Sequence, residues 1–222
     1  PMDPEDGPRG GARLGTAVHA LFEEMPLDTF QETDFERWLS LPVVAERLQR
    51  HHPGEGRRVV AEWIHRGLGR PLPLPGGGST ILAEAGPRLL RELDFLTPYP
   101  VGKDLLTGSI DALFEWQGRT FILDWKTNRL PEYGPSAVGS VVQESYGLQV
   151  KVYTLTTCRF LGIDNREAYE QLFGGVIYVF VRGLRHDQGV WTHRPTWEEV
   201  LGYRSDLADL PLARLIPAAA GG

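Results

Sequence analysis

The chain has 222 residues, enough for one substantial hydrophobic core, and its hydrophobic content of 41% and charged content of 23% are ordinary for a globular domain. It contains neither an apolar run of the roughly 18 residues that span a bilayer nor the apolar core of a signal peptide, so we expect a cytoplasmic protein without membrane contact. The net charge of −6 argues against a protein that coats nucleic acid by charge alone, but not against an enzyme that approaches DNA through metal ions.

The N-terminal run, residues 1–15, is acidic, rich in Pro and Gly, and lacks an initiator Met, which indicates a domain taken from a longer chain. We expect this single domain to cover residues 1–222, with a helical part over 1–70, a linker or loop over 71–80 and a core over 81–210. The Pro- and Gly-rich composition of the linker makes it the clearest break in the chain.

Three stretches of the N-terminal part have helical periodicity. The first covers residues 14–25 and ends at Pro26, and two more are expected over 29–52 and 56–69. His19 lies beside the apolar stripe of the first helix, where it is either a boundary histidine or a metal ligand. The remaining histidines of this part show no ligand-like spacing and are expected on the surface: His51, His52 and His65.

Residues 88–98, RLLRELDFLTP, are predicted to form a strand with Glu92 and Asp94 on one face. An acidic side chain on this strand could reach a site on the neighbouring strand. It could equally pair with Arg88 or Arg91, and the sequence leaves both alternatives open.

The stretch from Leu105 to Arg129, LLTGSIDALFEWQGRTFILDWKTNR, predicts two strands joined by a two-residue turn at Gln117-Gly118. On that register Asp111 lies directly opposite Asp124, and Lys126 projects to the same side. The opposite face is expected to be core: Ile110, Ala112, Phe114, Trp116, Phe121, Leu123 and Trp125.

Two carboxylates opposed across a ladder lie about 5 Å apart and repel each other. Such a pair persists where one group is protonated or where a cation lies between them, and oxygen ligands suit Mg²⁺ or Mn²⁺. Lys126, two residues after the second aspartate, would add the positive charge that phosphoryl-transfer chemistry needs. The alternative is a solvated outer face on which Asp111 merely sits opposite Asp124.

After the hairpin, a strong helix is predicted over about 144–161. Gln149 and Tyr153 lie one turn apart on one face, a pattern that by itself is usually an ordinary polar face. The residues expected to point inward are Leu148, Val152, Leu155 and Leu161.

The last part of the chain predicts a buried strand over 174–183, a partner strand over 189–193 and a final helix that opens at Thr196. Helices, strand, hairpin, helix, strand and helix in this order indicate the α/β class, with a central mixed sheet flanked by helices and a helical N-terminal part.

Four separated segments carry a resemblance to a known family. They are GTAVHALFEEM, TGSIDALFEWQGRTFILDWKTN, YGLQVKVYTLTTCRFL and GGVIYVFVRG, which together run from residue 15 to residue 183. This order, with its Asp…Asp-Trp-Lys core, resembles the PD-(D/E)xK nuclease superfamily, and within it the C-terminal nuclease domains of the RecB family of helicase–nuclease chains (exonuclease V). The resemblance implies a restriction-endonuclease-like core.

The resemblance also implies a role for each matching residue. His19, Asp111 and Asp124 would be metal ligands, together with the backbone carbonyl of Trp125, and Lys126 would hold or polarise the attacking water.

Three further residues would support this group by the same resemblance. Gln149 and Tyr153 would line the site near the phosphate backbone, and Glu92 occupies the place of an acidic residue on the strand before the hairpin.

The activity that the resemblance implies is that of a Mg²⁺-dependent deoxyribonuclease of the exodeoxyribonuclease V type, with Mn²⁺ as a substitute. Its substrate would be single-stranded DNA ends, fed by ATP-driven helicase motors during double-strand-break repair and recombination. Partners would be RecC- and RecD-like subunits and a RecA-like recombinase. The alternative is a nuclease-fold module that mainly recruits a recombinase or acts as a scaffold.

A lone Cys158 excludes a disulfide framework, a cysteine-based zinc site and the iron–sulfur cluster of some relatives.

Overall fold

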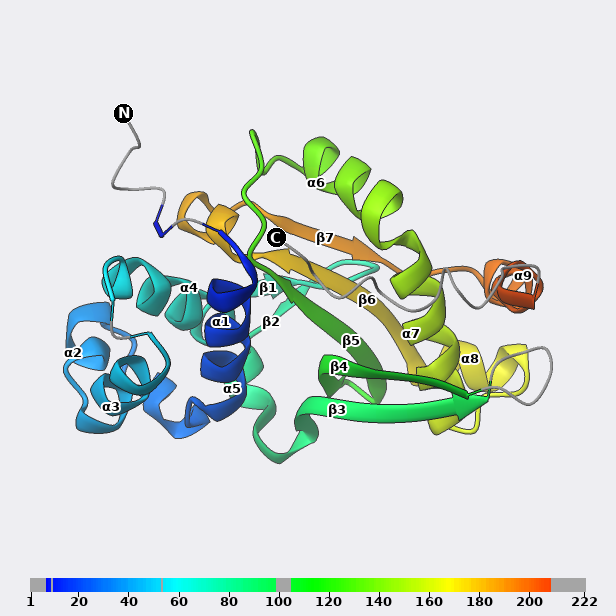
Figure 1. The fold of residues 1–222 in the computed structure, drawn as a ribbon. Helices are drawn as coiled ribbons and strands as arrows, with labels where there is room; N and C mark the ends of the chain where they lie inside the picture. The colour runs from blue at the N-terminus through cyan, green and yellow to red at the C-terminus, as the bar shows by residue number, and fades with distance from the viewer. Residues whose placement is uncertain (1–6, 9, 53, 99–104, 209–222) are drawn as a thin grey trace.

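A computed structural model describes residues 7–8, 10–52, 54–98 and 105–208 (Figure 1). The start of the Pro- and Gly-rich N-terminal run and the expected ends of the core at residue 210 and of the domain at residue 222 therefore lie outside the described residues. The helices are α1 (Ala12–Glu24), η2 (Leu27–Gln31), α2 (Phe35–Leu39), α3 (Pro42–His51), α4 (Arg57–Gly69), α5 (Leu82–Ala85), η3 (Gly86–Arg88), α6 (Pro135–Val141), η4 (Val142–Tyr146), α7 (Gly147–Phe160), α8 (Arg166–Leu172), η5 (Val181–His186) and α9 (Trp197–Ala208). The strands are β1 (Leu72–Pro73), β2 (Ser79–Thr80), β3 (Leu89–Pro98), β4 (Leu105–Trp116), β5 (Arg119–Lys126), β6 (Phe173–Phe180) and β7 (Val190–His193).

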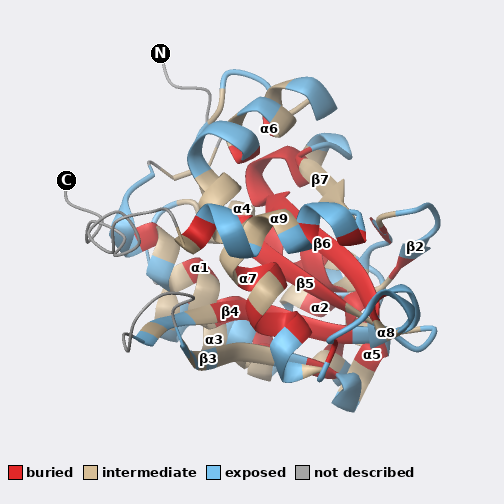
Figure 2. Cartoon of the chain, turned by 90° about the vertical axis from the view of Figure 1, so that its right-hand side faces the viewer, coloured by how far each residue is buried: buried red, intermediate tan, exposed pale blue. Residues whose placement is uncertain are grey.

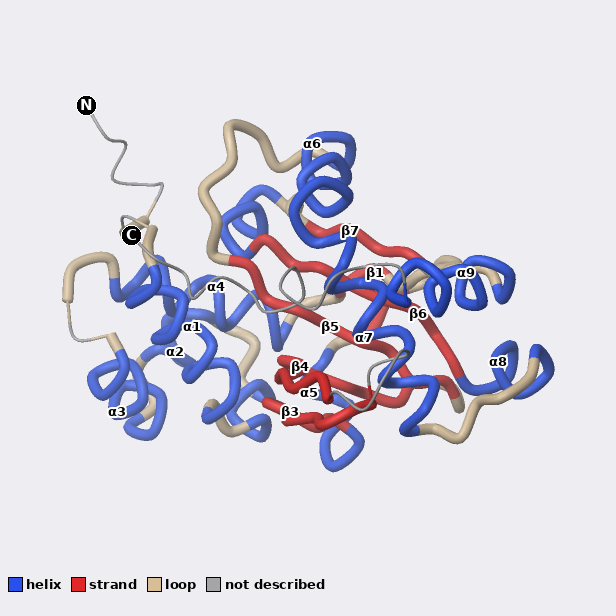
Figure 3. The backbone as a smooth tube through the Cα atoms, turned by 45° about the vertical axis from the view of Figure 1, so that its right-hand side comes forward, coloured by secondary structure: helices blue, strands red, loops and turns tan. Residues whose placement is uncertain are grey.

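The main sheet has five strands in the order β3-β4-β5-β6-β7. The β5 and β6 strands pair in parallel and the other neighbours pair antiparallel, so the sheet is mixed. The helices α1 to α4 lie on one side of these strands and α6 to α9 on the other (Figure 3). The predicted mixed sheet with flanking helices and a helical N-terminal part is confirmed.

Each face of the sheet has its own hydrophobic core. The first cluster packs the N-terminal helices onto strand residues such as Phe114, Leu123 and Val179. The second packs α6 to α9 onto Ile122 and Phe180. Strands β4 to β6 form the buried centre between the two clusters (Figure 2), and β6 is buried at every position. Such burial on both faces is typical of a strand that pairs in parallel.

The β4–β5 hairpin has the predicted turn. Gln117 and Gly118 have φ angles of 50° and 78°, and this left-handed pair matches the twist of the two strands. The register runs from Trp116 opposite Arg119 as far as Ala112 opposite Leu123, as the alternation predicts.

The ladder between β4 and β5 ends one position before Asp111 and Asp124. The Trp125 amide donates to the Asp111 carboxylate at 2.7 Å, so the two strands are joined here by a side chain. Next to this break in the ladder, Ile110 packs into the second core whereas Ala112 packs into the first, so the predicted place of Ile110 on the same face as Ala112 is wrong.

The N-terminal part differs from the expected helices in two respects. The stretch expected as one helix over 29–52 is divided, because Asp34 caps a new helix by accepting from the Arg37 amide and Pro42 opens the next one. His65 was expected on the surface and is buried, 3% exposed, against the rings of Phe30 and Trp38. An aromatic pocket formed by distant elements cannot be read from histidine spacing.

Three smaller segments also differ from expectation. The stretch over 71–80 contains the short antiparallel pair β1 and β2, in which Leu72 lies opposite Thr80. The helix expected over 144–161 contains a π-helical segment, η4. Of its expected inward residues, Val152, Leu155 and Leu161 are partly buried against the second core, whereas Val150 and Cys158 are fully buried. The strand expected to reach residue 183 ends at Phe180.

Helix α9 begins at Trp197, directly after Thr196, which was predicted to open it. The Thr196 hydroxyl accepts from the Glu199 amide at 3.2 Å, and the Glu199 carboxylate accepts from the Thr196 amide at 2.7 Å, which is a capping box. None of the helices in the described part of the chain has both the length and the apolar character needed to cross a membrane.

Candidate active site

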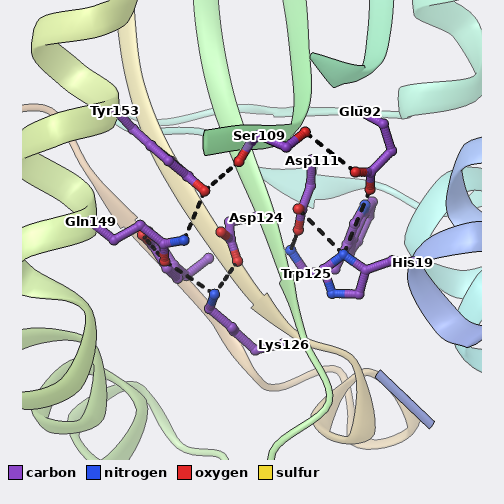
Figure 4. A network of polar contacts seen from close by, with 10 residues as sticks. His19, Glu92, Ser109, Asp111, Asp124, Trp125, Lys126, Gln149 and Tyr153 are labelled. Carbon is purple, nitrogen blue, oxygen red and sulfur yellow. Dashed lines mark hydrogen bonds and ion pairs between the residues drawn. The ribbon is translucent and has the colours of Figure 1, made fainter. Parts of the chain in front are cut away.

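The residues that the sequence singled out lie on five elements around the end of the β4–β5 ladder (Figure 4). They are His19 on α1, Glu92 on β3, Asp111 on β4, Asp124, Trp125 and Lys126 on β5, and Gln149 and Tyr153 on α7. Helices from both sides of the sheet therefore contribute to one group of side chains.

Asp111 is the centre of the first part of the site. Its Oδ1 lies 3.3 Å from Nδ1 of His19, and its Oδ2 accepts from the Trp125 amide at 2.7 Å. Glu92 completes the group, with its Oε1 3.7 Å from the same His19 nitrogen. One ligand atom from each of His19, Glu92 and Asp111 lies within 4.8 Å of the others, a geometry that can hold a metal ion.

Glu92 reaches this group through an unusual backbone conformation. Its φ is 49°, although it lies within strand β3 between the paired residues Arg91 and Leu93. A glutamate in the left-handed region is uncommon, and such strain is found preferentially at functional sites. The alternative that Glu92 pairs with Arg88 or Arg91 is wrong, because Arg91 donates to the carbonyls of Phe22 and Met25 and Arg88 donates to that of Ala85.

Asp124 and Lys126 form the second part of the site. Lys126 Nζ lies 2.6 Å from Asp124 Oδ2, and their side chains are 12% and 2% exposed. Lys126 also donates to Gln149 Oε1 at 3.1 Å. A buried pair with this geometry is strongly coupled electrostatically, because little water screens it.

The α7 residues continue this network. Gln149 donates from Nε2 to the Tyr153 hydroxyl at 2.8 Å, and its Oε1 accepts from the Tyr178 hydroxyl at 2.9 Å. The Tyr153 hydroxyl donates in turn to the carbonyl of Ser109 on β4. Gln149 and Tyr153 thus lie on a face that contacts Lys126 and β4, which is more than the ordinary polar face that their spacing alone indicates.

Burial and repulsion shape the charges of the carboxylates. Burial raises the pKa of Asp124 to about 7, with repulsion from Asp111 adding to this effect and Lys126 opposing it. Burial and the Asp111 charge also raise the pKa of Glu92. Burial is the main cause of both pKa shifts, and the negative charge of Asp111 adds to it.

His19 is shifted toward its charged form. Burial lowers the pKa of His19, but the hydrogen bond and charge of Asp111, together with Asp124 and Glu92, outweigh burial and raise it. The His19 ring thus lies 3.3 Å from the Asp111 carboxylate, which favours the charged form of the imidazole.

These residues fit a divalent cation. One imidazole nitrogen and the carboxylate oxygens of Glu92 and Asp111 form a donor set suited to Mg²⁺ or Mn²⁺. The Asp124 carboxylate is paired with Lys126 instead, so its ligation of a cation stays a prediction. A bound cation would offset the charge of Asp111, which adds to burial in raising the pKa values of Asp124 and Glu92. Ligation by the Trp125 carbonyl stays a prediction.

The position of Trp125 is set by the N-terminal helices. The Phe22 ring of α1 stacks on Trp125 with centroids 3.7 Å apart and planes 5° apart. A side chain on Gly67 of α4 would have its Cβ 2.7 Å from Phe22 and 3.1 Å from Trp125, so glycine leaves room for the stack. Packing against α1 therefore fixes the strand segment that carries Asp124 and Lys126.

Two tyrosines of the site were missed by the sequence reasoning. Lys126 Nζ lies 4.2 Å from the ring centroid of Tyr146 and 5.3 Å from that of Tyr178. Tyr178 is hidden in an apolar strand pattern. Tyr146 stands three residues before Gln149, a helical spacing that could have drawn attention to it.

The comparison with known families decides the class of the domain. The family model of the PD-(D/E)XK nuclease superfamily matches residues 3–215. The chain belongs to this superfamily. It is a nuclease domain by family, and PD-(D/E)XK nucleases use divalent metals, in keeping with the His19, Glu92 and Asp111 group.

The chain is also similar to individual proteins that share one name. The chain is 33% identical to the protein named RecBCD enzyme subunit RecB of Escherichia coli strain K12, over 87% of this chain and 19% of the relative. Proteins of the same name in Mycobacterium tuberculosis strain H37Rv and Chlamydia pneumoniae are 31% and 26% identical, over 65% and 78% of this chain and 16% of each relative. The PD-(D/E)XK domain thus spans about a fifth or less of the relatives it matches.

Proposed function

We propose that this PD-(D/E)XK domain is a Mg²⁺-dependent deoxyribonuclease that hydrolyses phosphodiester bonds of single-stranded DNA. The observation that carries the proposal is the convergence of two groups. His19, Glu92 and Asp111 form a cation-binding cluster, and Asp124 and Lys126 form a buried ion pair beside it. Metal-dependent phosphodiester hydrolysis needs this combination of hard ligands and a fixed positive charge.

The protein residues have distinct tasks in the proposed mechanism. A bound Mg²⁺ would lower the pKa of a water molecule and neutralise charge on a phosphate oxygen. Asp111 and Asp124 would hold the cation together with His19 and Glu92. Lys126, which contacts Asp124 at 2.6 Å, would donate a hydrogen bond to the attacking water or to a phosphate oxygen. Mn²⁺ would occupy the same ligands.

The proposed setting follows the names of the relatives. They are called RecB subunits of the RecBCD enzyme, so we infer that this domain works in an exodeoxyribonuclease V type assembly with RecC- and RecD-like subunits. Helicase motors elsewhere in such an assembly would deliver single-stranded ends during repair and recombination in the cytoplasm. A RecA-like recombinase is a further proposed partner.

A scaffold or recruitment module would not need the buried charges of this site. Asp124 is 1% exposed and has a raised pKa, so keeping it carries a cost in stability that a purely structural domain could avoid. This observation favours catalysis over the alternative of a recruitment or scaffold domain.

The proposal is tested by digesting end-labelled single- and double-stranded DNA with and without Mg²⁺. The wild type should degrade DNA only with Mg²⁺, should prefer single strands, and should leave 5′-phosphate ends. Asp124→Ala should lose activity by about 10³-fold or more, because both a ligand and the partner of Lys126 are removed. The matched control is Asp94→Ala, which removes an exposed carboxylate from β3. Equal activity in wild type and Asp124→Ala would contradict the proposed site.

A further inference from the structure

The ammonium group of Lys126 is surrounded by four side chains. Asp124 forms an ion pair with it, with 2.6 Å between Oδ2 and Nζ, and Gln149 Oε1 accepts a hydrogen bond from Nζ at 3.1 Å. The other two are aromatic faces, with Tyr146 at 4.2 Å and Tyr178 at 5.3 Å from Nζ to the ring centroid. Both rings lie within the roughly 6 Å at which the electron-rich face of a ring attracts a cation.

Tyr146 is brought to Lys126 by a local irregularity of the helix. It is the last residue of the π-helical segment η4, which separates α6 from α7. A π-helical turn inserts an extra residue, changes which side chains share a face, and is frequent at functional sites. Here it places Tyr146 beside Lys126 while Gln149, one turn further on, reaches the same ammonium group.

Tyr146 is held in place by a hydrogen bond of its hydroxyl group and by packing of its ring. Its hydroxyl donates to Asn128 Oδ1 at 3.0 Å, and Asn128 lies two residues after Lys126. Its ring packs on Tyr178, with centroids 5.7 Å apart. Because Asn128 and Lys126 belong to the same short segment, this anchor fixes the ring relative to the lysine.

We infer that Tyr146 is a positioning residue, whose ring face keeps the Lys126 ammonium aimed at the reaction site. The inference rests on the proposed function. Asp124 is both the ionic partner of Lys126 and a proposed cation ligand, and a carboxylate shared with a divalent cation attracts the ammonium less strongly. A neutral aromatic ring continues to attract the ammonium and does not compete for the cation.

The test compares the steady-state kinetics of Tyr146→Leu and Tyr146→Phe on single-stranded DNA with saturating Mg²⁺. Tyr146→Leu removes the ring, and kcat should fall about 10-fold while KM for DNA stays unchanged. Tyr146→Phe keeps the ring and loses only the bond to Asn128, so its kcat should stay within about 3-fold of the wild type. The matched control is Tyr203→Leu. The Tyr203 ring of α9 makes the same kind of contact with a different lysine, since Nζ of Lys151 on α7 lies 5.5 Å from its centroid. The kinetics of this control should equal those of the wild type.

A second comparison separates positioning from a structural role. In a Lys126→Ala background, the residual rate should not fall further when Tyr146→Leu is added, because the ring acts through the lysine. If Tyr146→Leu lowered the rate of Lys126→Ala by the same factor as that of the wild type, the inference would be overturned. A raised KM with unchanged kcat in the single variant Tyr146→Leu would also overturn it, because Tyr146 would then be a DNA contact.

If Tyr146→Leu does not fold, Asn128→Ala takes its place. Asn128→Ala should lower kcat by the same small factor as Tyr146→Phe, and the double variant should lose no more than either, because both remove one hydrogen bond. Additive losses would overturn the inference. A wild type without Mg²⁺-dependent cleavage would instead overturn the proposed function itself, a result that is distinct from unaltered kinetics in Tyr146→Leu.

Discussion

The carboxyl group of Asp124 is more deeply buried than that of Asp111, which is 8% exposed. It is 1% exposed, lies near Asp111, and has a pKa raised to about 7 by burial and by that neighbouring charge. Lys126 offsets only part of this effect. The charge on Asp124 therefore depends on pH in the range where most proteins keep their carboxylates ionised.

Cation binding should consequently depend on pH. A ligand carboxylate must be ionised, so between about pH 5 and 7 each Mg²⁺ bound would displace a proton from Asp124. The Mg²⁺ concentration for half-maximal activity should fall by up to about 10-fold per pH unit on raising the pH through this range, and level off above about 7. Titrating activity against Mg²⁺ at several pH values measures this dependence, with Mn²⁺ as a second cation.

The same shift predicts the sign of the effect on stability. Asp124 has a raised pKa in the folded protein, so without a cation its contribution is most favourable below the unfolded pKa of about 3.9 and is lost as the pH rises toward about 7. Asp124→Asn, which does not ionise, should remove this loss of stability when the free energy of unfolding is measured against pH.

For the activity titration, a Mg²⁺ requirement independent of pH between 5 and 8 would contradict the pKa shift.

At the scale of elements, the site depends on the contact between α1 and β5. The Phe22 ring stacks on Trp125, which lies between the two proposed functional residues of β5. Gly67 of α4 lies close to both rings and leaves no room for a larger side chain. A change in this stack should therefore affect both stability and the site.

Phe22→Leu tests this link. The substitution keeps an apolar side chain but removes the stacked ring, and it should lower the free energy of unfolding by about 1–2 kcal/mol. The movement of Trp125 should also weaken Mg²⁺ binding. Phe160→Leu is the matched control, because Phe160 is 63% exposed and its substitution should change stability by less than about 0.5 kcal/mol. Chemical denaturation and Mg²⁺ calorimetry would measure both effects. An equal loss of stability in both variants would contradict the proposed role of the stack.

The elements predicted well were those whose cause is local. The β4–β5 hairpin follows from side-chain alternation and from a turn in which Gln117 and Gly118 both adopt positive φ. The α9 helix follows from a capping box at Thr196. Ile110 was placed on the wrong face, because the ladder ends where the Asp111 side chain binds a backbone amide, a tertiary detail without a local signature.

The candidate site could be predicted only in part for the same reason. Asp111, Asp124 and Lys126 share one hairpin, so their proximity follows from its register. His19 comes from a helix far away in sequence, and family resemblance rather than spacing singled it out. Nothing in the sequence indicated the left-handed backbone of Glu92 or the π-helical segment that carries Tyr146.

At the scale of the whole molecule, the site joins the two hydrophobic cores. His19 belongs to α1, which packs on one face of the sheet, while Gln149 and Tyr153 belong to α7 on the other. A cation held by α1 and by strands of the sheet would add a link between the N-terminal helices and the central strands, beside the Phe22–Trp125 stack. Its binding should stabilise the entire domain rather than one loop.

Thermal unfolding in the presence of Mg²⁺ tests this expectation. A ligand that binds only the folded state adds about 2.7 kcal/mol at a concentration of 100 times its Kd. For a domain of this size, that corresponds to a rise in Tm of roughly 5–10 °C relative to a sample with chelator. The rise should be larger at pH 8 than at pH 6, because Asp124 is ionised at the higher pH.

Asp111→Asn is the decisive comparison for this measurement. Asparagine keeps an oxygen that can accept from the Trp125 amide, so the hairpin should remain closed, but the negative charge at the centre of the cluster is lost. The variant should unfold with little dependence on Mg²⁺, whereas Asp94→Asn should behave as the wild type does, because Asp94 is exposed on β3. An equal rise in Tm in all three proteins would mean that Mg²⁺ stabilises the domain at some place other than the Asp111 cluster.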